Sequence, residues 1–232
     1  MFQNGFIRFI AGAFLSALFS ATAYALPSTF DFRGGGGTRN PAGSTLTFFD
    51  EETGTQPVVV SAWVTVEPSN QIFASRLHRS NSGFGARHAL DSSSQIDNLF
   101  GFDFLALDLG TPNWEPVSAD IASAGAGCAL RLFGFCFVPT PEDDWFIRGS
   151  NTIAPGDGSP GIDGGFELLA SGSVSGTVNI ASTDTFQFIY FSGTPGFNLD
   201  PDSFDDDFRV AGFVGQFRPS RNPVLCCCSG SA

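Results

Sequence analysis

Alternation of apolar and polar residues over nine consecutive positions is the feature that most constrains how this chain can fold. Residues 58–66 place small apolar side chains on one face of an extended chain and Ser61, Trp63 and Thr65 on the other. Pro68, which has no backbone N–H to donate to a sheet, closes the run. This pattern predicts a β-strand with one face in the core.

Shorter runs of the same kind recur along the chain, separated by clusters of turn-forming residues. They include residues 185–191 and residues 173–180, where Val174, Val178 and Ile180 share a face. Further strands are predicted at residues 46–49, 103–109, 117–121, 129–138, 144–147, 166–170 and 208–214. The 28 Gly and 14 Pro favour many turns, and no stretch keeps a period of about 3.6. We predict an all-β fold, an antiparallel β-sandwich or jelly roll, although a closed barrel fits the same pattern.

The first 25 residues have the organisation of a secretory signal peptide. Arg8 precedes an apolar run at residues 9–19, and Ala23 and Ala25 occupy the two small-residue positions that a signal peptidase reads. The run is about half of the roughly 20 residues that a membrane-spanning helix needs. We expect a signal helix that is cut after Ala25, and export through the general secretory pathway to the exterior or the cell surface.

Glycine content and the predicted strands divide the rest of the chain into three parts. Residues 26–43 include four consecutive glycines and are expected to form a loosely held entry segment, residues 44–216 the sandwich, and residues 217–232 an irregular tail. The chain carries a formal net charge of −12 and has no cluster of basic residues. Such a chain repels nucleic acid, so no nucleic-acid partner is expected.

Five cysteines fall into two groups. Cys128 and Cys136 enclose seven residues of a strand-like region, and a tight hairpin there would allow a disulfide in an oxidising exterior. Two buried free thiols are the alternative. The adjacent cysteines at residues 226–228 are poorly placed to bridge one another, because a disulfide requires specific geometry.

Two acid-rich stretches could hold Ca²⁺, the one cofactor that the sequence suggests. The first contains Asp200, Asp202, Asp205 and Asp206, and carboxylate oxygens are the ligands that Ca²⁺ requires. The second contains Asp91, Asp97, Asn98 and Asp103. Neither has EF-hand spacing, and solvated acidic turns whose side chains bond to their own backbone explain both more simply.

The residues that catalysis requires are scarce. His78 and His88 are the only histidines, and we expect both to be polar loop residues. No Gly-x-Ser-x-Gly elbow occurs, and the sequence places no histidine near Cys128 or Cys136. Acids are too plentiful for any pair to stand out as that of a glycoside hydrolase. We therefore expect no catalytic residues.

A set of short motifs in a fixed order connects the chain to a known family. Residues 83–107 contain Gly-Phe-Gly, His-Ala-Leu-Asp, Gln-Ile-Asp-Asn and then an apolar strand with Phe-Leu-Ala-Leu. Asp-Asp-Trp-Phe follows at residues 143–146, and Asp-Asp-Asp-Phe-Arg-Val-Ala-Gly-Phe at residues 205–213. This progression resembles the PEP-CTERM family of exported bacterial surface proteins. The resemblance implies sorting by an exosortase and association with exopolysaccharide and biofilm.

Residues 217–232 depart from that family, whose members end in Pro-Glu-Pro, an apolar helix and a short arginine-rich tail. Back-translation of residues 219–223, read from the last base of the first codon, is compatible with Glu-Pro-Glu-Pro. The same frame through residues 226–231 is compatible with Leu-Leu-Leu-Gly-Leu-Gly. We therefore expect a sorting signal that is frame-shifted or lost, and a product that, as written, is released in soluble form.

These observations predict a non-enzymatic exported protein of the cell surface or extracellular matrix. Its expected partner is extracellular polysaccharide, with signal peptidase and exosortase as processing enzymes. The alternatives are a secreted carbohydrate-binding module, which Ca²⁺ could stabilise, and a secreted hydrolase. An exposed aromatic row would favour the module, although Trp63, Trp114 and Trp145 are expected in the core. A deep cleft with two facing acids would favour the hydrolase.

Overall fold

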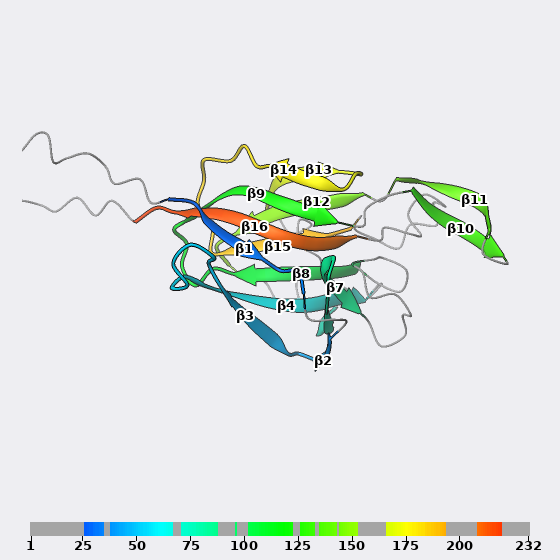
Figure 1. Cartoon of the computed structure of the whole chain (residues 1–232), viewed down its shortest axis with the longest axis horizontal. Helices are drawn as coiled ribbons and strands as arrows, with labels where there is room; N and C mark the ends of the chain where they lie inside the picture. Colours follow the sequence, from blue (N-terminus) through cyan, green and yellow to red (C-terminus); the bar gives the residue numbers. More distant parts are fainter. Residues whose placement is uncertain are drawn as a thin grey trace, which may run out of the picture.

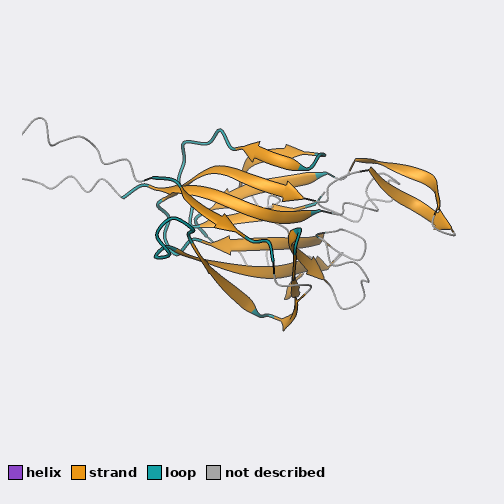
Figure 2. Cartoon of the chain, in the orientation of Figure 1, coloured by secondary structure: helices purple, strands orange, loops and turns teal. Residues whose placement is uncertain are grey.

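Strands are the only regular secondary structure in the described part of the chain. A computed structural model describes residues 26–34, 38–66, 71–87, 96, 102–122, 126–132, 135–142, 144–152, 166–193 and 208–219. These residues form sixteen strands, β1 to β16, and no helix (Figures 1 and 2). Nothing among them is a helix that could cross a membrane. The predicted signal helix falls outside these ranges.

Two antiparallel seven-stranded sheets form the body of the molecule, which confirms the predicted sandwich. The first sheet has the order β14 (Gly176–Asn179), β9 (Trp114–Ala122), β16 (Arg209–Phe217), β7 (Gly83–Arg87), β6 (Arg76–Ser80) and β2 (Thr38–Ala42). β1 (Ser28–Asp31) pairs with the C-terminal half of β16, and β7 pairs with β16 at Val210. β1 and β7 therefore share one edge of β16.

The second sheet is built in the same way. Its order is β13 (Glu167–Gly172), β12 (Trp145–Ser150), β15 (Phe188–Ser192), β8 (Phe102–Asp108), β4 (Pro57–Val66) and β3 (Thr45–Phe49). β5 (Gln71–Ala74) pairs with the C-terminal half of β4, and β3 pairs with its N-terminal half. β3 and β5 thus share one edge of β4.

The connections follow a jelly roll. From β7 onward the chain passes between the two sheets, except where β12 and β13 form a hairpin within one sheet. The resulting strand orders, β7-β16-β9-β14 and β8-β15-β12-β13, are those of an eight-stranded jelly roll. The strands from β1 to β6 widen both sheets. β10 (Ala126–Leu132) and β11 (Phe135–Glu142) pair only with each other and extend beyond one end of the sandwich (Figure 1).

The inward faces of both sheets meet in one apolar core. On β4, Val58, Val60, Ala62 and Val64 are at most 2% exposed, so the face predicted from their alternation is the buried one. From the first sheet, Phe30 packs edge-on against Trp114, with ring centroids 6.1 Å apart, and stacks on Phe213 at 6.4 Å. Burial of these large rings supplies much of the hydrophobic stabilisation.

Residues 26–43 were expected to form a loose entry segment, but their described parts, residues 26–34 and 38–43, belong to the sandwich. β1 is hydrogen-bonded to β16, and Phe30 and Phe32 are fully buried. The turn after β3 also holds β1, because the Glu51 N–H donates to the Thr29 carbonyl and the Thr29 N–H donates to Glu52 Oε2, both at 2.9 Å. The sandwich therefore begins at β1 and not at residue 44.

Three other strand predictions are corrected. The run at residues 129–138 is split between β10 and β11. Within residues 173–180 only β14 forms. Val174 lies in a bend before it and is 57% exposed. The Val174 carbonyl accepts a hydrogen bond from Trp145 Nε1. The glycine-rich residues 83–87, where no strand was predicted, form β7.

Candidate functional site

The structure does not gather the residues singled out from the sequence into one site. Asp200, Asp202, Asp205 and Asp206, and the cleavage residues Ala23 and Ala25, lie outside the described residues, so the Ca²⁺ site and the cleavage stay predictions. In the β10–β11 hairpin, Cys128 lies opposite Pro139 and Cys136 opposite Arg131. The two cysteines are therefore not cross-strand partners, and their disulfide stays a prediction. Within the described ranges, no group of three or more His, Cys, Asp or Glu side chains could hold a metal ion.

Some of the remaining expectations hold and others do not. Trp114 and Trp145 are core residues, as expected, whereas Trp63 is half-buried on the outer face of the second sheet. His78 is not a loop residue: it lies in β6, is 8% exposed, and has Nδ1 3.1 Å from Arg209 Nη1. Asp103 is buried within β8, and the other members of its predicted Ca²⁺ loop lie outside the described residues.

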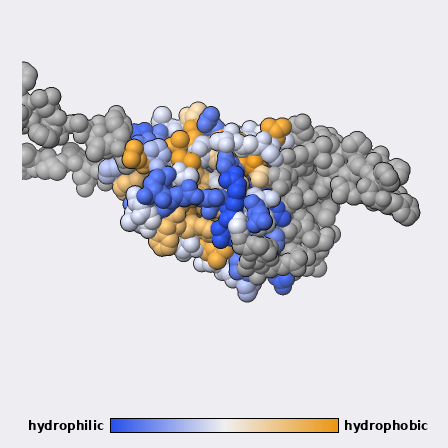
Figure 3. Space-filling model, in the orientation of Figure 1, coloured by the Kyte–Doolittle hydropathy of each residue, from blue (hydrophilic) through white to orange (hydrophobic). Residues whose placement is uncertain are grey.

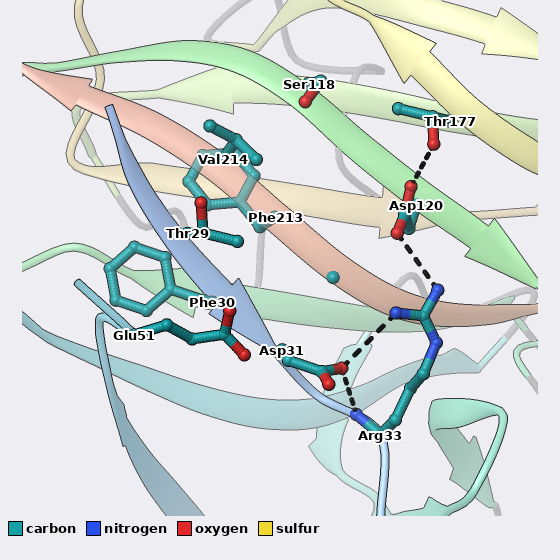
Figure 4. Close-up of a pocket in the computed structure, with 11 residues that line it drawn as sticks. Thr29, Phe30, Asp31, Arg33, Glu51, Ser118, Asp120, Thr177, Phe213 and Val214 are labelled. Carbon is teal, nitrogen blue, oxygen red and sulfur yellow. Dashed lines mark hydrogen bonds and ion pairs between the residues drawn. The ribbon is translucent and has the colours of Figure 1, made fainter. Parts of the chain in front are cut away.

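A polar depression on the outer face of the first sheet is the candidate site (Figure 4). Its volume is about 300 Å³. Four adjacent strands, β14, β9, β16 and β1, build it, and their register sets Thr177, Asp120, Gly212 and Asp31 in one row. The neighbouring row contains Ser118, Val214 and Thr29. Antiparallel pairing thus places these side chains next to one another, because residues in register project to the same face.

Gly212 opens the middle of the first row. A Cβ atom at this position would lie 3.2 Å from the Phe30 carbonyl oxygen and 3.7 Å from the Asp120 side chain. With only a hydrogen there, a hollow remains between Asp120 and Asp31. The hollow therefore exists because position 212 of β16 is a glycine.

Arg33, just after β1, spans this hollow. Its Nη2 lies 3.0 Å from Asp120 Oδ2, its Nη1 lies 3.6 Å from Asp31 Oδ1, and its backbone N–H donates to the same Asp31 oxygen at 2.9 Å. Thr177 Oγ1 donates to the other oxygen of Asp120 (Figure 4). The side chains of Arg33, Asp31 and Asp120 are 48%, 42% and 30% exposed, so these pairs contribute little to stability but hold a defined arrangement of charges.

The depression offers donors and acceptors side by side. Guanidinium N–H groups, carboxylate oxygens and the hydroxyls of Thr29, Ser118 and Thr177 all line it, with Glu51 at its rim. Figure 3 shows hydrophilic residues gathered across this face, where Figure 1 places β1 and β16. Arg33 holds the carboxylates of Asp31 and Asp120 in place. Together with the hydroxyls beside them, these charged groups can form hydrogen bonds with a polar ligand.

Comparison with known proteins gives no further assignment. No family model, curated protein or solved structure matches this chain.

Proposed function

We propose that this chain is a non-enzymatic, exported jelly-roll protein that associates with polysaccharide at the cell surface or in the extracellular matrix. The signal-like residues 1–25 and the motif order that resembles the PEP-CTERM family support export and surface sorting. The depression around Arg33 and Asp120 supports the polysaccharide partner. Jelly rolls include lectins, but the fold alone does not assign a function, so the site must carry the argument.

The depression suits a sugar because a sugar hydroxyl both donates and accepts hydrogen bonds. Arg33 supplies donors, Asp31 and Asp120 supply acceptors, and Thr177 and Ser118 can do either. All except Arg33, which directly follows β1, project from strands, which hold their positions better than loops do. The arrangement of polar side chains around an open hollow is the single observation that carries this proposal.

The two alternatives fit this surface less well. A carbohydrate-binding module that stacks sugars needs exposed aromatic residues, and on the described surface the exposed ones are Phe49 and Phe73, which lie on separate edge strands. A glycoside hydrolase needs a carboxyl group free to donate a proton. In the depression, both Asp31 and Asp120 are held by Arg33, and the second oxygen of Asp120 accepts from Thr177.

Binding of the purified full chain to immobilised polysaccharides tests the proposal. We expect retention on at least one of two neutral polysaccharides, a β-glucan and a mannan. Asp120→Ala, which removes the partner of both Arg33 and Thr177, should weaken this binding at least tenfold while shifting the melting temperature by less than about 2 °C. Asp184→Ala, at an exposed position outside the depression, is the matched control. Unchanged binding by Asp120→Ala would reject the depression as the site.

A further inference from the structure

Arg148 is a buried cation on the outer face of the second sheet, opposite the face that packs in the core. It is 8% exposed, and its Nη1 donates to Ser192 Oγ at 2.7 Å. Its guanidinium also lies 4.9 Å from the centre of the Phe146 ring. Among the described residues it forms no ion pair with a carboxylate. A guanidinium has five N–H donors, so after the bond to Ser192 the others can hydrogen-bond with a ligand or with solvent.

The hydroxyl of Tyr190, beside Arg148, is a buried donor without a hydrogen-bond partner. Arg148 on β12 and Tyr190 on β15 are direct cross-strand partners, and Ser192 is the next residue of β15 on the same face. Tyr190 is 2% exposed, and its hydroxyl has no hydrogen-bond partner. Burial raises the pKa of Tyr190 well above its ordinary value, and the negative charge of Asp108 adds to the shift. The phenol therefore stays protonated and able to donate.

Aromatic rings surround these two donors. Phe166 packs edge-on against Tyr190 with ring centroids 4.9 Å apart, and Phe104 and Phe188 lie 6.1 and 6.5 Å from the same ring. These rings belong to an apolar cluster that is separate from the core. Phe166 also lines an open groove of about 400 Å³ together with Ser150, Asn151 and Thr152. The groove brings open space up to a residue that contacts Tyr190.

A buried donor without an acceptor, such as the Tyr190 hydroxyl, is costly unless an acceptor completes it, and the guanidinium beside it has donors beyond the one that Ser192 accepts. We propose that Arg148, Tyr190 and Ser192 form a binding site for the carboxylate of a uronic acid unit, and that an acidic polysaccharide is therefore a ligand of this protein. A planar guanidinium matches a carboxylate with two parallel hydrogen bonds. Phe166, which is half-buried and lines the groove, suits the apolar C–H face of the sugar ring. This site lies on the opposite sheet from the depression around Arg33 and does not depend on it.

Thermal unfolding of the full chain with D-glucuronate, with D-glucose and with inorganic phosphate tests the proposal. Glucuronate near 100 times its Kd should raise the melting temperature by about 5 °C, whereas equal concentrations of glucose and phosphate should not. Arg148→Met should abolish this shift and leave the unliganded melting temperature unchanged or higher, because a buried unpaired charge has been removed. Arg76→Met, at an exposed position of the first sheet, is the charge-matched control and should retain the shift.

Tyr190→Phe gives a second test that removes a single oxygen atom. We expect it to weaken glucuronate binding about tenfold. Retention of the full shift by Arg148→Met or by Tyr190→Phe would overturn the proposal, as would equal stabilisation by phosphate or by glucose. Asp120→Ala should leave the glucuronate shift intact, so failure of this site and failure of the depression give different results.

Discussion

The backbone of Gly83 packs directly on that of Val210, so closely that a Cβ atom on Gly83 would lie 2.3 Å from the Val210 carbonyl oxygen. Gly83 also has a φ of +113°, a conformation that favours glycine. This contact is where β7 joins β16, and both strands belong to the jelly roll. Any side chain at position 83 must therefore push the two strands apart.

We predict that Gly83→Ala lowers the free energy of unfolding by about 3 kcal/mol or more, because a backbone clash adds to the conformational cost. Gly54→Ala is the matched control: its φ is +66°, but a Cβ there meets nothing within 4 Å. Conformational cost alone should reduce its stability by about 1 kcal/mol. Urea unfolding of both variants measures the difference, and equal losses would contradict the account.

Asp50 anchors the turn between β3 and β4 and should make stability depend on pH. Its buried carboxylate accepts hydrogen bonds from the backbone N–H groups of Thr53, Thr55 and Gln56 at 2.8, 2.9 and 2.6 Å. Burial raises the pKa of Asp50, but these bonds, with one from the Thr53 hydroxyl, outweigh it and hold the pKa at about 2. Because the folded-state pKa is below the unfolded one, this stabilisation is present above about pH 4 and is lost as the pH falls towards 2.

We therefore expect Asp50→Asn to lower stability at pH 7 by about 2 kcal/mol and to flatten the dependence of stability on pH between about 4 and 2. Denaturant unfolding at several pH values measures both effects. Glu51→Gln, at the exposed neighbouring position, should change neither. If Asp50→Asn loses as much stability as the unmodified protein between about pH 4 and 2, other carboxylates cause the pH dependence.

β1 should contribute to stability through its aromatic side chains. Phe30 is fully buried between Trp114 and Phe213, so Phe30→Ala is expected to cost about 3 to 5 kcal/mol. Phe49 is 56% exposed, and Phe49→Ala should cost less than about 1 kcal/mol. Calorimetric melting of the two variants compares them. Similar losses of stability in the two variants would show that β1 contributes little to the core and that residues 26–34 are a loosely held segment.

The ion pairs across the depression should matter little for folding. Arg33→Gln breaks the contacts with both Asp31 and Asp120, yet these side chains are about a third to a half exposed. The expected loss of stability is under about 0.5 kcal/mol and should vanish in about 1 M salt. If unfolding instead shows a large loss at high salt, Arg33 has a structural role that the exposed geometry does not explain.

Strands with clear alternation could be predicted from the sequence, and strands held by their neighbours could not. β4 is predicted because its small apolar residues face one way through most of its length. β6 reads Arg-Leu-His-Arg-Ser and β7 reads Gly-Phe-Gly-Ala-Arg, and neither is rich in the β-branched and aromatic residues that favour strands. Their strand structure comes from pairing with each other and with β16. For β1, the alternation of Phe30 and Phe32 was a usable signal that the glycines after it obscured.

The depression could not have been found from the sequence, because its members are distant in the chain. Arg33 and Asp120 are separated by 87 residues, and only the register of β1, β16 and β9 brings them together. Arg148 and Tyr190 lie in strands whose apolar runs were predicted, but alternation alone does not say which face a second layer covers. Periodicity identifies faces, whereas sites on those faces depend on which strands are neighbours.

The pairing of β1 with the C-terminal half of β16 places Ser28 opposite Gly215, so the chain enters and leaves the sandwich at the same pole. The β10–β11 hairpin extends from the far pole (Figure 1). If the protein were attached to a surface through either terminus, the long axis of the sandwich would point away from that surface and the β10–β11 hairpin would lie farthest from it. Both outer sheet faces, with the Arg33 depression on one side and Arg148 on the other, would then flank the upright body, where two different polymer strands could pass without competing for space.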